Sequence, residues 1–313
     1  MALFAPAVWA QDFPVTVPHA FGITTVTEAP QRIASVGWAN HEVPLALGIV
    51  PVGFARASWG DDDGDGLLPW VTEWLEVLDA ETPVLFDEGD GIDFEAVAST
   101  RPDVILAAYS GLSRADYDTL SRIAPVIAYP EAAWTTTWRQ MIRQNAAGLG
   151  RAEAGEEMVA EIESRIVTAR AQHPELEGKT GMFVTHLDPR DLSTIGFYAA
   201  ADQRVQFLTD LGMATPKAVQ TASEAGKYSG RVSAERIDLF EDVDVIVTYG
   251  DQARLDGLTQ NPLIARFPAV SRGSVVLLQN DPMGTAANPT PLSIDYVLDD
   301  YLTRLSAAAA RAE

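Results

Sequence analysis

The chain has 313 residues, 47% of them hydrophobic, which provides core for roughly two domains of about 150 residues each. Its 44 acidic and 22 basic side chains give a formal net charge of −22, which repels phosphate backbones and anionic lipid headgroups and disfavours nucleic-acid and membrane-surface binding. The chain contains no cysteine, which excludes disulfides, thiolate nucleophiles, Cys-ligated zinc, iron–sulfur clusters and a lipid-modified N-terminal cysteine.

Residues 1–11 predict the remnant of a secretory signal peptide. The first ten residues, MALFAPAVWA, are apolar and uncharged, and they are too short to span a bilayer, which needs about 20 residues. They end in Val8-Trp9-Ala10, a small-x-small cleavage pattern. We therefore expect a mature chain that starts near Gln11, a periplasmic location and no membrane insertion. An ordinary disordered N-terminus with chance alanines is the alternative.

The first part of the chain alternates between short apolar strands and helices, which is the βαβ pattern of a mostly parallel sheet. This pattern predicts an N-terminal α/β lobe over residues 12–133. The expected strands are 32–37, 50–54, 84–86, 104–109 and 126–129, and the expected helices are 42–47 and 114–123.

Residues 134–173 predict a helical connector, because they are helical in composition and contain no proline. We expect one helix to about residue 149 and a second over 152–172, about 30 Å long and able to run between two lobes. After Pro174 the alternation resumes and predicts a C-terminal α/β lobe over residues 174–313. Its expected strands are 181–186, 192–195, 243–249 and 274–278, and its expected helices are 201–211, 235–240 and 294–305.

One pattern occurs twice in the chain. In each copy a glutamate follows a capping-type residue by two positions, opens a short amphipathic helix and precedes by 14 residues a tyrosine that closes an apolar strand. The glutamates are Glu95 and Glu235, and the tyrosines are Tyr109 and Tyr249. Two matching helix–strand units predict two similar lobes.

Several short segments also occur in a specific order and spacing. They are 32–35 (RIAS) with 40–42 (NHE), 46–53 (ALGIVPVG), 93–95 (DFE), 101–106 (RPDVIL), 120–126 (LSRIAPV) and 268–275 (PAVSRGSV). Over roughly residues 30 to 305 they together resemble the periplasmic substrate-binding proteins of ABC importers for ferric siderophores, a family that also contains the vitamin B12-binding protein.

The resemblance implies two α/β lobes with mostly parallel sheets joined by a long connecting helix, as in class III periplasmic binding proteins. It implies a monomer that holds one ligand, an iron(III)–siderophore complex, in the cleft between the lobes and delivers it to an inner-membrane ABC permease. It also implies that Glu95 and Glu235 dock into arginines of that permease. A pair of exposed carboxylates set far apart can fix both position and orientation against basic pockets. The alternative is that each glutamate merely favours the N-terminal dipole of its own helix.

A ferric siderophore carries iron that is already fully chelated, so its binding protein needs aromatic walls and hydrogen-bond donors, with cations if the ligand is anionic, and no metal ligands. The candidates lie just beyond the predicted strands or in the loops that follow them. They are Trp38, Arg56, Trp59, Tyr109, His186, Arg190, Tyr198, Tyr228 and Met283. Tyr249 is a further candidate that can simply end a buried strand, and each aromatic can instead pack within its own lobe.

The class of siderophore stays open. Arg56 and Arg190 favour an anionic ligand, whereas the overall charge of −22 opposes one. Hydroxamate, catecholate and carboxylate siderophores are therefore all compatible with the sequence.

Direct binding of a free metal is not expected. The four histidines, His19, His41, His173 and His186, are scattered along the chain, which disfavours a common site. His41 in the first turn of a helix and His173 just before a proline are expected at solvated positions.

The segment 61–66 (DDDGDG) matches the D-x-D-x-D-G start of a calcium loop. The twelfth position of such a loop requires a bidentate glutamate, but here it is Thr72. A solvated acidic loop is therefore expected.

No enzyme is expected, and no residue is assigned a catalytic role. The chain has no G-x-S-x-G elbow, no Walker loop and no H-E-x-x-H motif. A two-lobed α/β hydrolase with an unrecognised site is the alternative of another class. Within the expected fold, the alternative is a haem- or corrinoid-binding protein, and haem would need an axial ligand such as Tyr109, Tyr228 or His186.

Overall fold

The computed structural model describes residues 13–185, 193–223 and 227–312. The chain divides into two compact units. The first unit contains residues up to 56, 74–133 and 139–161, and the second contains 57–73, 134–138 and the residues from 162 onward. The predicted signal remnant at residues 1–11 lies outside the described residues.

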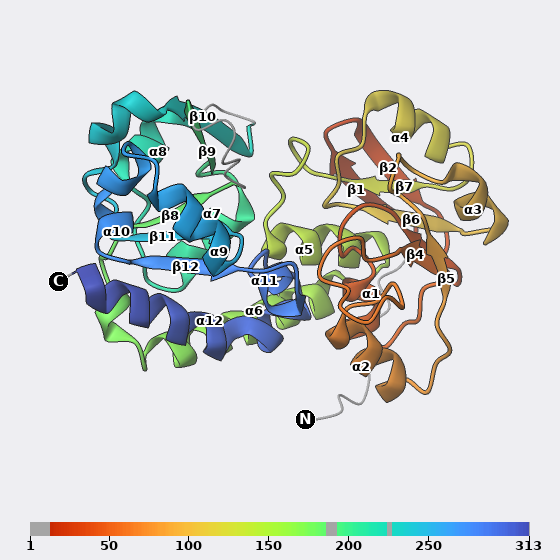
Figure 1. Cartoon of the computed structure of the whole chain (residues 1–313). Helices are drawn as coiled ribbons and strands as arrows, with labels where there is room; N and C mark the ends of the chain where they lie inside the picture. The colour runs from red at the N-terminus through yellow and green to blue at the C-terminus, as the bar shows by residue number, and fades with distance from the viewer. Residues whose placement is uncertain (1–12, 186–192, 224–226, 313) are drawn as a thin grey trace. The chain divides into compact units, whose positions relative to one another are not determined.

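The first unit is built on a five-stranded parallel sheet (Figure 1). Helices follow its strands in turn, which confirms the predicted βαβ alternation. The strand order is β5 (Val84–Phe86), β4 (Gly53–Ala55), β3 (Ile33–Ser35), β6 (Val104–Ala107) and β7 (Val126–Ala128). The helices that follow β3, β5 and β6 are α1 (Glu42–Ala46), α3 (Phe94–Ser99) and α4 (Arg114–Leu120).

The alternation of side chains along β6 divides the core of this unit between the two faces of the sheet. Ile105 and Ala107 pack with residues of α3 and α4. Val104 and Leu106 pack with an antiparallel hairpin, β1 (Val15–His19) and β2 (Gly22–Val26), and with the end of α5 (Trp138–Gly148). All four side chains are fully buried, as expected for a strand covered on both faces.

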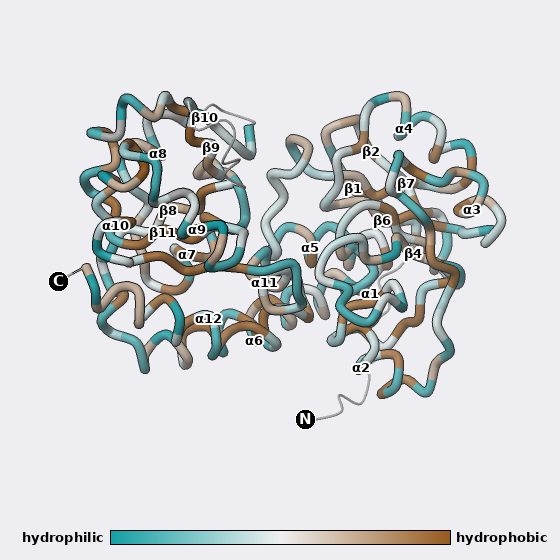
Figure 2. Tube along the Cα trace, viewed as in Figure 1, coloured by the Kyte–Doolittle hydropathy of each residue, from teal (hydrophilic) through white to brown (hydrophobic). Residues whose placement is uncertain are grey.

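The second unit contains a mixed sheet in which β8 (Gly181–Val184), β11 (Val245–Tyr249) and β12 (Val275–Leu278) are parallel. β9 (Thr194–Tyr198) and β10 (Ser229–Ser233) continue it in antiparallel order on the β8 side. Its sequence VVLL makes β12 apolar throughout, and it is drawn brown in Figure 2. Two α/β units with mostly parallel strands confirm the predicted fold class.

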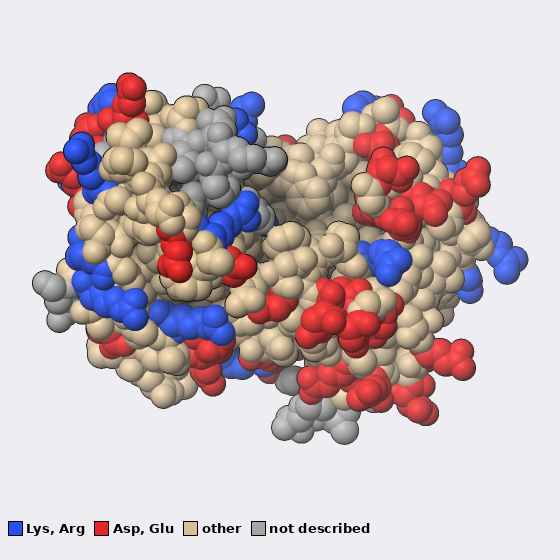
Figure 3. Space-filling model, in the orientation of Figure 1, with Lys and Arg blue, Asp and Glu red and all other residues tan. Residues whose placement is uncertain are grey.

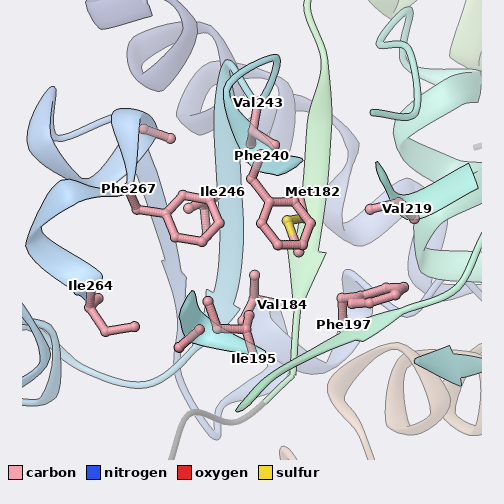
Figure 4. Packing of buried hydrophobic residues seen from close by; sticks show 12 residues of the cluster. Met182, Val184, Ile195, Phe197, Val219, Phe240, Val243, Ile246, Ile264 and Phe267 are labelled. Atoms are coloured by element: carbon pink, nitrogen blue, oxygen red, sulfur yellow. The ribbon is translucent and has the colours of Figure 1, made fainter. Parts of the chain in front are cut away.

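The core of the second unit packs one face of this sheet against short helices (Figure 4). Met182 and Ile246 project from β8 and β11 toward Phe240 and Phe267, whose rings stack with centroids 5.2 Å apart. These phenylalanines end η2 (Ala234–Phe240) and precede α10 (Pro268–Ser271). The sheet and the helices that follow it therefore share one apolar cluster.

Long helices complete the two units. α6 (Ala152–Arg170) matches the expected helix over 152–172, and the boundary between the units falls within it. α12 (Ser293–Ala309) buries Ile294, Val297 and Tyr301 on one face, as its amphipathic pattern predicts. The remaining helices are α2 (Pro69–Val77), α7 (Gln203–Asp210), α8 (Lys217–Ala222), α9 (Gln252–Thr259), α11 (Pro282–Ala286), η1 (Pro174–Leu176), η3 (Ile264–Arg266) and η4 (Ala310–Ala312).

The two units are not contiguous in sequence, which differs from the predicted lobes over 12–133 and 174–313. Residues 57–73 pack with the second unit, because Gly60 N donates to Asn280 Oδ1 over 2.7 Å and the Trp70 ring lies 5.1 Å from that of Tyr296. The expected connector over 134–173 is shared between the units as well. These long-range contacts have no local sequence signal.

Asn40 holds together two loops at the carboxyl edge of the first sheet. Its Nδ2 donates to Val36 O and to Tyr109 O, both over 2.9 Å. Its Oδ1 accepts from Tyr109 N and from Asn145 Nδ2, both over 3.0 Å. The side chain is fully buried, so these bonds are shielded from water. The loop after β3 is thus bonded to the loop after β6 and to α5.

Glu88 supports the same loop from the other side of β3. Its carboxylate accepts from Gly37 N over 3.0 Å, and burial raises its pKa from 4.5 to about 7 although the Gly37 N–H opposes the rise. Gly37 has φ +73°, and a Cβ there would lie 2.7 Å from Ser110 Cβ. Only glycine lets the β3 loop pass this close to the β6 loop.

We predict that Asn40→Ala lowers the free energy of unfolding by roughly 2–4 kcal/mol, because it leaves buried backbone and amide groups without partners. Urea denaturation followed by circular dichroism measures this loss. The exposed Gln172 provides the control, since Gln172→Ala should change stability by about 0.5 kcal/mol or less. An equally small effect of Asn40→Ala would contradict the role assigned to this side chain.

We also predict that Glu88→Gln stabilises the protein at pH 8. The folded state binds the Glu88 proton more tightly than the unfolded state does. The contribution of protonated Glu88 to the free energy of unfolding is therefore fully present below pH 4.5 and is lost as the pH rises through about 7. At about 1.4 kcal/mol per pKa unit, reduced by solvent screening, the gain at pH 8 is roughly 1–2 kcal/mol. Urea titrations of both proteins at pH 8 and pH 4.5 should show a difference only at pH 8, and a gain of equal size at both would argue against it.

Candidate ligand-binding site

In the first unit, the predicted site residues follow three neighbouring strands. Trp38 follows β3 and is half-buried, and its N–H donates to Tyr109 O over 3.1 Å. Tyr109 follows β6, but its side chain is only 2% exposed and lies in the core. Arg56 follows β4 and is exposed. The carboxyl ends of parallel strands share one edge of a sheet, so this edge carries an indole and a guanidinium.

This edge of the first unit carries both basic and acidic side chains. Among the described residues, none forms an ion pair or a side-chain hydrogen bond with the Arg56 guanidinium. Its backbone N–H donates to Phe86 O, the last residue of β5, which Asp87 and Glu88 directly follow. One cation and two carboxyl groups therefore lie at the ends of adjacent strands.

In the second unit, an arginine and three aromatic side chains form what we term the arginine cluster: Trp59, Tyr198, Arg204 and Tyr249. The Arg204 guanidinium lies over the Tyr198 ring at 4.1 Å from its centroid, and its Nε donates to Tyr249 Oη over 3.2 Å. The Trp59 ring meets that of Tyr249 edge-on with centroids 5.9 Å apart. The cluster offers flat apolar surface beside a fixed hydrogen-bond donor.

Asp202 orients the arginine of this cluster. As the N-cap of α7, it accepts from Arg204 N over 2.8 Å, and its second oxygen accepts from Arg204 Nη1 over 2.8 Å. Asp202 is fully buried, and burial raises its pKa while the guanidinium and the N–H of Arg204 oppose that rise. A buried carboxylate bonded to both ends of one residue leaves the guanidinium little freedom.

The tyrosine and the tryptophan of the cluster are also fixed. Burial raises the pKa of Tyr249 above its ordinary value, although Arg204 opposes the rise, so its hydroxyl stays protonated at neutral pH. Trp59 precedes Gly60, whose φ is +78° and where a Cβ would lie 1.9 Å from Thr285 Oγ1. Only glycine at position 60 lets the loop that carries Trp59 pass this close to Thr285.

Sequence reasoning missed Arg204 and Trp134 as candidates. Arg204 lies in the first turn of α7, and only the antiparallel return of β9 brings Tyr198 beneath it. Trp134 is half-buried and has φ +61°, a conformation that costs energy in a non-glycine residue and often marks a functional site. The aromatic residue at the start of the predicted connector was the available signal.

The other predicted residues fall in different places. Tyr198 joins the arginine cluster, and its ring also meets Phe183 edge-on with centroids 5.3 Å apart. Tyr228 is 40% exposed, and its carbonyl accepts from Ala199 N directly after β9. Met283 lies half-buried in α11. His186 and Arg190 lie outside the described residues.

The histidines of the described residues do not form a metal site. The expectation that His41 is solvated is wrong: it is 8% exposed, its ring stacks on Phe54 at 4.1 Å, and burial lowers its pKa to about 3. His19 bonds Thr24 Oγ1 over 2.9 Å, and His173 Nδ1 lies 2.7 Å from Ser306 Oγ. Each ring serves its own part of the core.

The aspartates of segment 61–66 do converge. Carboxylate oxygens of Asp61, Asp63 and Asp65 lie within 4.8 Å of one another, the one such group among the described residues. Asp61 accepts from Gly64 N and Gly66 N, so these carboxylates also close their own loop. Thr72 lies inside α2, and the described loop provides no glutamate at its twelfth position.

The repeated glutamates both lie exposed in the first turn of a short helix. Glu95 is in α3, where the Asp93 side chain accepts from Ala96 N over 2.9 Å. Glu235 is in η2, where Ser233 Oγ accepts from Glu235 N over 3.3 Å. The second helix is 3-10 rather than α and is kinked at Arg236. The predicted order of helix, strand and tyrosine is present in both units.

Comparison with known proteins agrees with this architecture. The structure of PiaA from Streptococcus pneumoniae TIGR4 in complex with ferrichrome has a TM-score of 0.91 and 40% identity, with 96% of this chain and 100% of that chain covered. The ferric enterobactin-binding periplasmic protein FepB of Escherichia coli O6:H1 is 26% identical over 87% of this chain and 86% of its own length. The ferric-anguibactin-binding protein FatB of Vibrio anguillarum is 23% identical over 93% and 87%.

Within the described residues, no helix has the length and apolar character needed to cross a membrane. The profile of the periplasmic binding proteins matches residues 33–282, which span both sheets and the arginine cluster. The similar proteins are named for binding, and none of the three is named as an enzyme. On this evidence, the chain belongs to the periplasmic binding protein family.

Proposed function

We propose that this protein captures a ferric siderophore outside the cytoplasm and delivers it to an ABC-type permease for iron uptake. The observation that carries the proposal is the arginine cluster, in a chain 40% identical to a protein whose structure contains ferrichrome. The aromatic faces and the guanidinium of this cluster suit a bulky complex with polar oxygen atoms on its surface.

The geometry of the cluster supports binding of a preformed complex rather than of free iron. Siderophore oxygens already coordinate the metal, so the protein needs only to cover the organic shell and to donate hydrogen bonds to it. Trp59 and Tyr198 are half-buried, and Arg204 is held by Asp202 and Tyr249 with 15% of its side chain exposed. Because these groups are held before the ligand arrives, binding costs little ordering of side chains.

In the first unit, we assign Trp38 and Arg56 to ligand contact. Trp38 is half-buried on a loop whose backbone is fastened through Asn40, and its indole is our candidate for an aromatic wall. Arg56 is an exposed donor on the neighbouring strand end. Tyr228, Met283 and Trp134 are further candidates, while the buried Tyr109 supports the loop instead.

Glu95 and Glu235 are our candidates for contact with the permease. Both are exposed and begin helices at matching positions of the two units. Acidic side chains gather near α3 in Figure 3. In the sequence, the exposed Asp87 and Asp90 lie shortly before Glu95. Exposed carboxylates suit basic partner surfaces, which makes an arginine-bearing permease the fitting partner.

We predict that iron-loaded siderophores quench the fluorescence of the seven tryptophans, two of which we place at the ligand. Titration against a panel of ferric hydroxamate, catecholate and carboxylate complexes should give at least one Kd below roughly 10 μM, which corresponds to about 7 kcal/mol. Absence of any such ligand, with folding confirmed by circular dichroism, would overturn the proposed function.

We predict that Arg204→Gln weakens binding of that ligand roughly tenfold to hundredfold, because it removes a charge-assisted donor worth about 1.5–3 kcal/mol. The Kd of Arg204→Lys should lie between those of the unchanged protein and Arg204→Gln, because lysine keeps the positive charge but lacks the planar guanidinium. Arg304→Gln, which breaks the exposed pair with Asp300 on α12, is the matched control and should leave Kd unchanged. Equal Kd values for Arg204→Gln and the control would remove Arg204 from the site.

We predict that the double variant Glu95→Ala, Glu235→Ala retains its affinity for the ligand and loses most iron uptake in cells that depend on the cognate permease. The exposed Glu153 and Glu241, changed together to alanine, provide a control with the same loss of charge. Similar uptake by the two double variants would show that the docking surface lies elsewhere.

A further inference from the structure

The names of the similar proteins include two ligands of different charge, ferrichrome and ferric enterobactin. The charged groups of this chain favour one of these two ligand classes. Resting on the proposed function, we infer that the ligand is a ferric complex without net charge, of the tris-hydroxamate class, and that the site rejects a trianionic tris-catecholate. The inference follows from the balance of charged groups at the carboxyl ends of the strands in each unit.

The chemistry of the two classes differs in one respect that a protein can read. Each hydroxamate carries one negative charge, so three of them cancel the charge of the ferric ion. Each catecholate carries two, so a tris-catecholate complex keeps three excess negative charges. Desolvating a trianion is costly unless the protein supplies net positive charge around it.

In the second unit, aspartates accompany Arg204 and the end of β11. Arg204 is bonded to the buried Asp202 over 2.8 Å, which cancels the charge of the arginine cluster. Directly after β11, the exposed Asp251 accepts from the backbone N–H of Arg254 over 2.8 Å, which places a further carboxylate at this end of the strand. After β12 comes Asp281, whose side chain caps α11. Arg204 is thus paired with Asp202, while Asp251 and Asp281 add carboxylates after β11 and β12.

The loop that carries Trp59 adds further negative charge. The next residues of this loop include Asp61, Asp63 and Asp65, whose carboxylates converge within 4.8 Å. The pKa of Tyr296, whose ring packs on Trp70, is raised first by burial and then by the negative charges of Asp62, Asp281 and Asp300. The surroundings of Trp59 therefore repel an anion instead of attracting one.

The first unit shows the same balance. Arg56 follows β4, and Asp87 and Glu88 follow the neighbouring β5. The charged groups named above, all within the described part of the chain, offer no net positive charge to a trianion. Aromatic faces with a few fixed donors remain, and these suit a neutral complex.

The test is a pair of fluorescence titrations, one with ferrichrome as the neutral tris-hydroxamate and one with ferric enterobactin as the trianionic tris-catecholate. We expect ferrichrome to bind at least roughly tenfold more tightly, with a Kd that changes less than about twofold between 0.05 and 0.5 M NaCl, since screening acts only on charged pairs. Tighter binding of ferric enterobactin, or a salt dependence beyond twofold for ferrichrome, overturns the inference and leaves the proposed function standing. Failure of both probes and of ferric carboxylate complexes overturns the proposed function itself.

Charge variants test the same inference from the side of the protein. Asp202→Asn leaves Arg204 uncompensated and still provides an N-cap for α7, so the affinity for ferric enterobactin relative to ferrichrome should rise about tenfold. Asp251→Asn at the exposed end of β11 is a second variant, expected to act in the same direction without disturbing a buried group. Asp244→Asn, at the opposite end of β11, removes the same charge and should leave the ratio unchanged. An unchanged ratio in folded Asp202→Asn and Asp251→Asn proteins would overturn the inference.

Discussion

The first unit depends on the four hydrogen bonds of one buried amide. Asn40 bonds the loop after β3, the loop after β6 and α5, so three elements that are distant in the chain share one saturated donor and acceptor set. All four bonding groups of the Asn40 amide are paired, and displacing either loop would break some of these buried bonds. The backbone at Trp38 is held in the same arrangement, since its N–H donates to Tyr109 O.

In the second unit, a charged pair rather than an amide holds a loop and a site side chain in place. Asp202 caps α7 and binds the guanidinium of the residue that it caps, so one carboxylate both ends a loop and aims a side chain. The two units share the order of helix, strand and tyrosine, but the two tyrosines have different roles. Tyr109 is packed into the core, whereas Tyr249 accepts a hydrogen bond from Arg204 Nε. Repetition of a backbone unit therefore does not require repetition of its surface chemistry.

Local patterns were sufficient for much of the fold and for part of the site. The strand over 84–86, the helix from 152 and the amphipathic helix at the C-terminus follow from apolar periodicity alone. The hairpin of β1 and β2 was missed because Pro18 interrupts an otherwise alternating strand. Arg204 was missed because its partner Tyr198 lies under it only through antiparallel pairing, and the burial of His41 depends on the distant Phe54.

The discontinuous second unit has a consequence for how the chain acquires its structure. Gly60 bonds a residue 220 positions later in the sequence, and Trp70 packs on a tyrosine of the final helix. During synthesis, residues 57–73 emerge long before the strand and helices that cover them. Their tryptophans stay uncovered until nearly the whole chain is present, so the second unit completes last, and a truncated chain lacking α11 and α12 retains an apolar segment prone to self-association.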